Sequence, residues 1–202
     1  NQMANFNSRI DGLPEILSGA WKYQDSSLYN TMTILSTDES YAKRHLVPFG
    51  EYVPFENLLR GIIDFFDMPM SDVIKGKSNQ KPMLFDTQSL KKMAPLICFD
   101  IAFSESVRKS NISSKFIINV SNDTWFGNSI GPYQHLHLAR IRAHENNRWL
   151  IRAANDGFSA IINNEGTIVQ YIEKGEKGVL NGSLQYIENR SFYSKYGYLF
   201  SY

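Results

Sequence analysis

The chain has 202 residues, of which 43% are hydrophobic, and its 21 basic and 20 acidic side chains leave a net charge of +1. This length and apolar content suffice for one domain with a sizeable core, and we expect a single domain over residues 1–202. The balanced charge argues against a nucleic-acid-binding surface, and the single cysteine, Cys98, excludes an internal disulfide.

Strand and helix signals alternate along the first half of the chain. Residues 28–35 predict a strand, whereas residues 45–54 carry two prolines and a glycine and predict an extended loop. Residues 55–66 place apolar side chains at helical spacing. Residues 93–99 form an apolar run that is typical of a buried strand, and a helix is expected to follow with Ser104 as its N-cap.

The second half continues the alternation. An Asn-Asp-Gly sequence between two apolar runs predicts a hairpin, and a proline in the first turn is compatible with a helix. Because the apolar runs lack strict alternation, we expect an α/β fold whose sheets are covered on both faces. The predicted elements are strands at residues 116–120, 149–154, 158–163, 168–172 and 178–186, and one helix at residues 132–147.

Both ends of the chain suggest that it is a piece of a longer protein. It begins at Asn1 without an initiator methionine, shows no signal peptide, and ends in an aromatic-rich stretch at residues 193–202. Those aromatic side chains are typical either of a membrane interface or of the last part of a core. No stretch reaches the roughly 18–20 consecutive apolar residues that a membrane-spanning helix needs.

The lone cysteine is the first candidate for chemistry. Cys98 ends a predicted buried strand and precedes a predicted helix, whose partial positive charge at the N-terminus favours a thiolate. A single cysteine is otherwise typical of a small buried hydrophobe. A lysine and a carboxylate in the dense stretch at residues 41–54 favour a thiol nucleophile instead.

The lysine and the carboxylate have roles that such a nucleophile requires. Attack by a thiolate on a carbonyl produces an oxyanion, which needs hydrogen-bond donors. Lys43 and the backbone N–H of Phe99 are the candidate donors, and Glu51 would orient Lys43 and keep it protonated. The alternative is a solvated surface pair, which would contribute at most about 1 kcal/mol.

Two histidines offer a weaker alternative for the activation of the Cys98 thiol. His45 and His135 would permit a Cys–His dyad, but neither stands in a context that specifies a base. The four histidines are too scattered for a convincing metal site, and the sequence contains no glycine-rich phosphate loop. No metal and no cofactor are therefore expected.

Five stretches of the chain carry family motifs. They are residues 41–54, residues 68–71, residues 97–100, residues 121–127 with 131–135, and residues 142–148 with 152–157. Together they resemble the carbon–nitrogen hydrolase (nitrilase) superfamily and, within it, the bacterial apolipoprotein N-acyltransferases. Lys43 and Cys98 belong to the elements that the whole superfamily shares, whereas His-Leu-Val-Pro-Phe-Gly-Glu (45–51) resembles the acyltransferases in particular.

The resemblance implies an αββα sandwich of the nitrilase type and a Glu–Lys–Cys catalytic set. By match, Cys98 would be the nucleophile, Lys43 the lysine that stabilises the oxyanion, and Glu51 the additional glutamate beside them. The general-base glutamate is expected upstream of Asn1, so the sandwich would be incomplete at its N-terminus. Membrane helices would flank the domain, which would face the periplasm at the bacterial inner membrane as part of a monomer.

Two positions next to the nucleophile depart from the acyltransferase pattern. The chain has Phe99 and Asp100 where Cys-Tyr-Glu is usual, and Cys-x-Asp resembles the soluble amidases of the superfamily. Those amidases usually continue with an arginine, which is absent here. Phe99 and Asp100 are expected at the oxyanion or in the pocket. Trp125 is expected in the pocket wall, although a tryptophan in such a loop is more often simply packed.

The implied reaction is a two-step acyl transfer. Cys98 would take an acyl chain from a membrane phospholipid as a thioester, and the α-amine of a diacylglyceryl-cysteine on an apolipoprotein would then accept it. Lipid substrates need an apolar route, so residues 55–70 predict either a mobile access arm or an ordinary core-packed helix. The candidate arm residues are Leu59, Ile62, Phe65, Phe66 and Met68.

Two other functions stay open at this point. A soluble amidase that acts on a small amide would use the same Cys98 and Lys43. A catalytically inactive domain that binds lipid or a protein partner would need no base. Nucleic acid is not expected as a partner, because the chain lacks a basic field.

Overall fold

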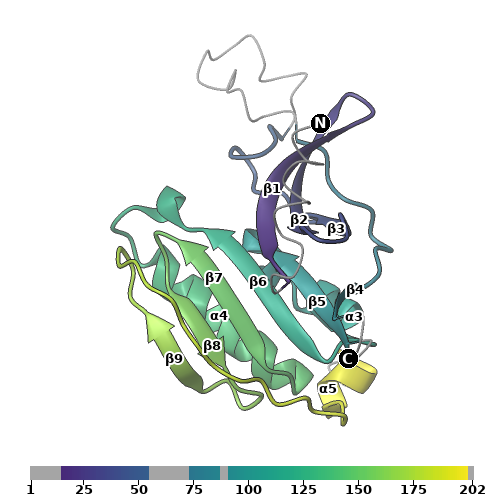
Figure 1. The fold of residues 1–202 in the computed structure, drawn as a ribbon, viewed down its shortest axis with the longest axis vertical. Coiled ribbons are helices and arrows are strands. Elements are labelled where there is room, and N and C mark those ends of the chain that lie inside the picture. Colours follow the sequence, from purple (N-terminus) through teal and green to yellow (C-terminus); the bar gives the residue numbers. More distant parts are fainter. Residues whose placement is uncertain (1–14, 55–72, 87–90, 200–202) are drawn as a thin grey trace.

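The computed structural model describes residues 15–54, 73–86 and 91–199 (Figure 1). Their strands form a three-stranded sheet in the order β1-β2-β3 and a six-stranded sheet in the order β4-β5-β6-β7-β8-β9. The elements are β1 Leu17–Gln24, β2 Ser27–Ile34, β3 Ser40–Ala42, β4 Met83–Asp86, β5 Lys91–Ile97, η2 Cys98–Ala102, α3 Ser104–Ser110, β6 Phe116–Asn122, η3 Thr124–Phe126, α4 Gly131–Asn146, β7 Leu150–Asn155, β8 Ser159–Ile162, β9 Ile168–Ile172 and α5 Phe192–Tyr196.

The sheets and helices stack in layers. Helices α3 and α4 pack on one face of the six-stranded sheet, and the three-stranded sheet packs on the opposite face. The side chains of β5 point alternately toward the helices and toward the three-stranded sheet, because successive side chains of a strand point to opposite faces. Ala94 and Leu96 belong to the helix-side core, whereas Met93 and Ile97 belong to the core between the sheets. The predicted α/β class, with a sheet covered on both faces, is confirmed.

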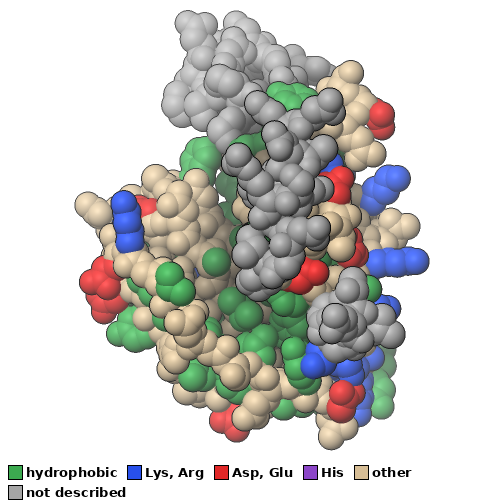
Figure 2. All heavy atoms as spheres, viewed as in Figure 1, with side chains coloured by type: hydrophobic (Ala, Val, Ile, Leu, Met, Phe, Trp, Pro, Cys, Tyr) green, Lys and Arg blue, Asp and Glu red, His purple; other side chains and the backbone are tan. Residues whose placement is uncertain are grey.

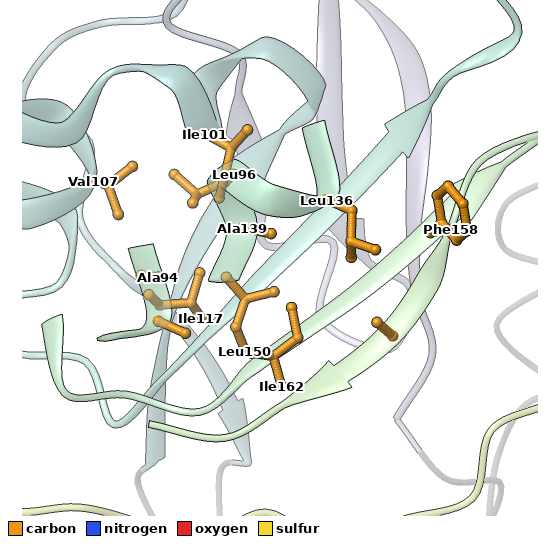
Figure 3. Packing of buried hydrophobic residues seen from close by; sticks show 12 residues of the cluster. Ala94, Leu96, Ile101, Val107, Ile117, Leu136, Ala139, Leu150, Phe158 and Ile162 are labelled. Atoms are coloured by element: carbon orange, nitrogen blue, oxygen red, sulfur yellow. The ribbon is translucent and has the colours of Figure 1, made fainter. Parts of the chain in front are cut away.

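The helix-side core joins α4 to the middle of the large sheet (Figure 3). Ala139 and Ala143 of α4 are fully buried, and their small side chains let the helix approach the sheet closely. Ile117 and Leu150, on neighbouring parallel strands, face them. Each such buried aliphatic side chain stabilises the fold by about 1.5–3 kcal/mol relative to exposure. This core fixes α4 against β6 and β7.

One predicted strand is wrong. Residues 178–186 contain no strand; this segment runs across the face of the large sheet that Figure 1 presents. Two of its side chains contact the core between the sheets: Leu184 packs against that core, and the Tyr186 ring lies 6.0 Å from the Phe116 ring, centroid to centroid. In Figure 2, hydrophobic side chains gather on this face while most charged side chains lie toward its edges. The segment thus packs on the sheet through Leu184 and Tyr186 without pairing with it, whereas Val179 is 84% exposed.

The other predictions have mixed outcomes. The predicted strands at 28–35, 93–99 and 116–120, the helix at 132–147 and the hairpin around Asn-Asp-Gly all correspond to observed elements. Helix α3 does begin at Ser104, but its N-cap residue is Phe103 and no side chain caps it. Strands β1, β3 and β4 and helix α5 lacked a prediction. Most side chains of β1 are exposed or half-buried, so β1 offers a weak hydrophobic pattern.

The topology of the large sheet brings distant segments together at one edge. Strands β5, β6 and β7 are parallel neighbours, so their carboxyl ends lie side by side. Cys98 follows β5, Asn122 ends β6 and Asn155 ends β7. Open α/β sheets commonly bind ligands outside such carboxyl ends.

Two expectations from the sequence concern the membrane: the access arm for lipid and the lack of a membrane-spanning stretch. Residues 55–72, which include the whole candidate access arm with Leu59, Ile62, Phe65, Phe66 and Met68, lie outside the described residues. Among the residues that the structure does describe, no helix combines the length and the apolar character needed to cross a bilayer.

Candidate active site

A cavity of about 600 Å³ lies where the carboxyl ends of β5 and β6 meet the small sheet. Cys98 lines it together with Lys43 and Glu51, although they come from two segments that lie far apart in the sequence. Phe99 and Trp125 line it as well. The fold therefore brings Cys98, Lys43, Glu51 and two of the three predicted pocket residues, Phe99 and Trp125, to one cavity.

Cys98 occupies an unusual backbone position. It is the first residue after β5, and its φ of 47° lies in the left-handed region that non-glycine residues rarely adopt. This conformation costs roughly 1–2 kcal/mol. Cys98 begins the short 3-10 helix η2, and α3 starts only at Ser104, so the thiol does not stand at the N-terminus of the predicted α-helix. The side chain is half-buried and borders the cavity.

Lys43 and Glu51 form a buried ion pair rather than a surface pair. The Lys43 Nζ atom lies 2.5 Å from Glu51 Oε2, and the two residues are only 2% and 5% exposed. The Asn30 side-chain amide donates to Glu51 Oε1 at 2.7 Å, and the Val47 N–H donates to Oε2 at 2.8 Å. The carboxylate is thus held by three donors. Burial excludes the solvated alternative that the sequence left open.

Backbone hydrogen bonds fix the two ends of this pair. The Lys43 N–H donates to the Asn30 carbonyl at 2.8 Å, which extends the pairing of β3 with β2 by one residue. The Glu51 N–H donates to the Val47 carbonyl at 2.9 Å and closes a turn that contains Pro48. The predicted loop at residues 45–54 therefore serves to return Glu51 to Lys43.

Asp100 has a different position from the one expected. It is 1% exposed and is not among the residues that line the cavity. Its carboxylate accepts hydrogen bonds from the Tyr41 hydroxyl at 2.9 Å, the His45 N–H at 2.8 Å and the Ile97 N–H at 3.1 Å. Burial, followed by the Asp100 charge, raises the pKa of Tyr41 well above its usual value, so the phenol stays a donor. Asp100 ties the Lys43 segment to the strand that leads to Cys98.

Phe99 and Trp125, the two aromatic residues predicted for the pocket, both line the cavity. Phe99 is half-buried, and its ring meets the Phe103 ring edge-on at 5.2 Å between centroids. Trp125 is 58% exposed although it lines the cavity, so it is not simply packed. Trp21 of β1 and Phe126, both also more than one-third exposed, join it along the cavity wall. The cavity thus has a largely aromatic rim.

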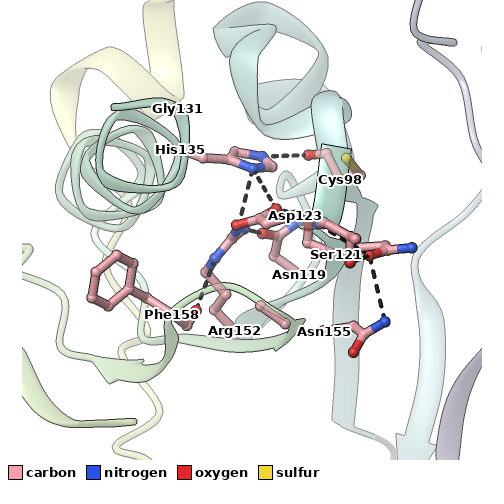
Figure 4. Close-up of polar contacts among 12 residues, drawn as sticks. Cys98, Asn119, Ser121, Asp123, Gly131, His135, Arg152, Asn155 and Phe158 are labelled. Atoms are coloured by element: carbon pink, nitrogen blue, oxygen red, sulfur yellow. Dashed lines mark hydrogen bonds and ion pairs between the residues drawn. The ribbon is translucent and has the colours of Figure 1, made fainter. Parts of the chain in front are cut away.

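A buried polar network behind Cys98 was not predicted (Figure 4). His135 of α4 lies with Nε2 3.1 Å from the Cys98 carbonyl oxygen and Nδ1 3.0 Å from Asp123 Oδ1. Arg152 of β7 donates to Asp123 Oδ2 at 2.7 Å and also to the Asn119 side-chain oxygen. His135 is 5% exposed, Arg152 1% and Asp123 0%. The sequence signal was a polar residue just beyond β6 and an arginine inside an apolar strand.

The charge on Asp123 is strongly favoured by this network. Burial raises its pKa, but the hydrogen bond with His135 and the charge of Arg152 outweigh burial and lower the pKa to about 2. Ser121 Oγ also donates to Asp123 Oδ1 at 2.6 Å. Asp123 is therefore an ionised carboxylate at neutral pH, fully enclosed by its donors.

The same residues bring metal-type donor atoms together. Single donor atoms of Cys98, Asp123 and His135 all lie within 4.8 Å of one another. The carboxylate oxygens and the imidazole nitrogens already have hydrogen-bond partners, however, and Arg152 brings a positive charge within 3.1 Å of His135 Nδ1. A cation would have to displace these partners, so the arrangement indicates a hydrogen-bond network.

Comparisons with known proteins agree on one family. A family profile described as carbon-nitrogen hydrolase matches residues 14–190. The chain is 46% identical over 159 residues to an apolipoprotein N-acyltransferase of Pseudomonas syringae pv. tomato, which covers 78% of this chain and 31% of that protein. It is 34% identical over 213 residues to the protein of the same name from Shewanella oneidensis, covering 98% of this chain and 40% of that one. The chain thus spans well under half the length of these curated relatives.

Solved structures show the same fold. Saccharomyces cerevisiae Nit3, a member of branch 10 of the nitrilase superfamily, matches with a TM-score of 0.63 and 21% identity over 88% of this chain and 63% of that chain. A carbon-nitrogen hydrolase from Helicobacter pylori matches with a TM-score of 0.64 and 13% identity over 87% of this chain and 64% of that chain. The predicted nitrilase-type sandwich is confirmed.

Proposed function

Because the chain belongs to the carbon–nitrogen hydrolase family, we propose that it is the catalytic domain of an N-acyltransferase in which Cys98 carries the acyl group. The observation that supports this most is the shared cavity: Cys98 and the buried Lys43–Glu51 pair line the same 600 Å³ space. A thiol and an ammonium at one cavity are what acyl transfer through a thioester requires.

In the first half-reaction, the Cys98 thiolate attacks the ester carbonyl of a phospholipid. A C–S bond forms, and negative charge develops on the carbonyl oxygen, where the Lys43 ammonium and the Phe99 N–H are the proposed donors. Collapse of this intermediate breaks the C–O bond, and the lysophospholipid leaves with the proton that the Cys98 thiol had given to the general base. Glu51 contributes by holding Lys43 in place and charged.

In the second half-reaction, the α-amine of a diacylglyceryl-cysteine attacks the thioester. A C–N bond forms, the C–S bond breaks, and the thiol of Cys98 is regenerated. The amine loses a proton in this step, which requires a general base. We assign that role to the glutamate that the family resemblance places upstream of Asn1, in the longer protein.

The cavity wall suits an acyl chain. Ile97, Val120 and Leu138 line it with aliphatic side chains, and Trp21 and Trp125 line it with aromatic rings. Such a surface favours a hydrocarbon substrate over a small polar amide. The curated relatives are named apolipoprotein N-acyltransferases, which supports a lipoprotein acceptor. The phospholipid donor and the location at the inner membrane facing the periplasm are part of the proposal and follow from the family resemblance.

The test is turnover by the full-length protein with a phospholipid and a diacylated lipopeptide. The proposal predicts lysophospholipid and N-acylated lipopeptide in equal amounts, and neither product from Cys98→Ala. Ammonia release from small amides without lipid turnover would identify an amidase. A folded protein that binds lipid but forms no product would identify a non-catalytic binding domain.

A further inference from the structure

We propose that His135 is a positioning residue that aims the backbone N–H of Phe99 at the oxyanion by holding the carbonyl of Cys98. The inference rests on the proposed thioester chemistry at Cys98. It assigns a role to a buried side chain that contributes nothing to the Lys43–Glu51 pair.

The hydrogen bond from His135 to Cys98 has a defined direction. A carbonyl oxygen only accepts, so the Nε2 atom that lies 3.1 Å from the Cys98 oxygen carries the proton. On the other side of the ring, Nδ1 faces both an Asp123 oxygen at 3.0 Å and an Arg152 nitrogen at 3.1 Å. When Nδ1 accepts from Arg152, the ring is neutral and its proton is on Nε2; when Nδ1 donates to Asp123, the bond to Cys98 is kept only in a ring that carries both protons.

The peptide plane transmits this contact to the oxyanion donor. The carbonyl of Cys98 and the N–H of Phe99 belong to one planar trans peptide group, in which they point in opposite directions. An anchor on the Cys98 oxygen therefore fixes the direction of the Phe99 N–H. Because Cys98 has a φ of 47°, a conformation that is unfavourable without support, such an anchor is needed at this peptide.

The imidazole itself is held rigidly. His135 lies in the first half of α4 and is 5% exposed, and its ring meets the Phe126 ring edge-on at 5.8 Å between centroids. Behind it, Asp123 is enclosed by Arg152, which also donates to the Phe158 carbonyl at 3.2 Å (Figure 4). The buried network thus extends from β7 through His135 to the peptide that follows the nucleophile.

The experiment compares two isosteric substitutions in the full-length protein. His135→Gln keeps an N–H donor near the Nε2 position, whereas His135→Asn places its amide near Nδ1 and leaves the Cys98 carbonyl without a donor. His137→Gln, at an exposed position on the same helix, is the matched control. Two reactions of the thiol are followed: acylation by a p-nitrophenyl ester, which passes through an oxyanion, and alkylation by iodoacetamide, which does not.

We expect His135→Asn to slow acylation about 100-fold, the loss that follows removal of one oxyanion donor, with little change in KM. Alkylation should stay within about threefold of wild type, because a displacement at carbon develops no oxyanion. His135→Gln should retain acylation within about fivefold. If His135→Asn does not fold, the folded His135→Gln variant decides: a loss of acylation of more than about fivefold would contradict the inference.

Three results would overturn the inference: equal losses in acylation and alkylation, no loss of acylation in His135→Asn, or a loss in His135→Gln as large as in His135→Asn. A wild-type protein that reacts with iodoacetamide but never with the ester also overturns it. Because neither reagent is a lipid, failure of the phospholipid reaction alone refutes the proposed function and leaves this test standing.

Discussion

The ammonium nitrogen of Lys43 lies 2.5 Å from a carboxylate oxygen of Glu51, and both side chains are almost completely buried. Removal of two charges from water is unfavourable unless each charge compensates the other and the remaining polar atoms find hydrogen bonds. Asn30 and Val47 supply two such bonds to the carboxylate. The pair beside Cys98 is therefore maintained as a unit, and its members should respond differently to single and double substitution.

Glu51→Gln should destabilise the fold by about 3 kcal/mol, because it leaves a buried ammonium without its counter-charge. Chemical unfolding of the variant and of wild type measures the difference. Glu176→Gln, at an exposed position, serves as the control and should change the free energy of unfolding by less than about 0.5 kcal/mol. Equal stabilities of Glu51→Gln and wild type would show that the pair is not buried as described.

The double variant Lys43→Met/Glu51→Leu should recover most of the stability that Glu51→Gln loses. Replacement of a whole buried ion pair by apolar side chains of similar volume is often neutral or stabilising. Acylation of Cys98 should nevertheless be lost, because the proposed oxyanion donor is gone. A double variant that is both stable and fully active would remove Lys43 from the mechanism.

The sequence singled out three residues that line one cavity, but it did not predict how deeply two of them are buried. Lys43, Glu51 and Cys98 were identified from their residue types and from family motifs. Their burial could not be predicted, because it depends on the return of the loop at residues 45–54 onto β2 and β3. Asp100 shows the same limit: its neighbourhood in sequence suggested the pocket, but long-range hydrogen bonds to Tyr41 and His45 direct it into the core.

Tyr41→Phe should destabilise the protein by about 1.5–3 kcal/mol, the contribution typical of a hydrogen bond to a buried charged group. The phenol donates to Asp100 at 2.9 Å, and both residues are 1% exposed. Thermal or chemical unfolding checks this. Tyr171→Phe provides the control, because that hydroxyl is exposed and its contact with Glu173 is long, at 3.5 Å. Similar effects of the two substitutions would contradict the role given to Asp100.

Acid should weaken the fold through Asp123. Its pKa of about 2 in the folded protein is below the usual value of about 3.9, so the stabilisation is fully present above pH 4 or so. It is lost as the pH falls from about 4 to about 2 and amounts to about 2 kcal/mol. Measured between pH 6 and pH 2, the stability difference between wild type and Asp123→Asn should shrink by that amount. A constant difference would mean that Asp123 is not specifically stabilised as an anion.

Gly157→Ala should disturb the same network from the hairpin between β7 and β8. A Cβ at position 157 would lie 2.3 Å from Asp123 Oδ2, and Arg152 and His135 prevent that carboxylate from moving. Overpacking of this kind typically costs about 1–3 kcal/mol. Gly19→Ala is the matched control, since its Cβ would meet Val120 at an ordinary 3.8 Å. If Gly157→Ala is as stable as wild type, the Asp123 carboxylate can move away from the added methyl group at little cost in free energy, and the network is not rigid.

The contacts of the buried network that sequence reasoning missed share a physical cause. Arg152 and Asn119 lie on neighbouring parallel strands, and His135 reaches Cys98 across 37 positions of sequence. Such contacts depend on which strands become neighbours, and no local pattern encodes that order. The wrong strand at residues 178–186 has a related origin, because an apolar segment that packs on a sheet shows the same composition as one that pairs within it.

The most direct test of the account is the intact mass of the full-length protein after incubation with phospholipid and no acceptor. We predict a mass increase of one fatty-acyl chain that hydroxylamine removes, that a diacylated lipopeptide consumes, and that is absent in Cys98→Ala. Absence of the adduct in wild type, or its persistence in Cys98→Ala, would contradict the claim that this thiol carries the acyl group.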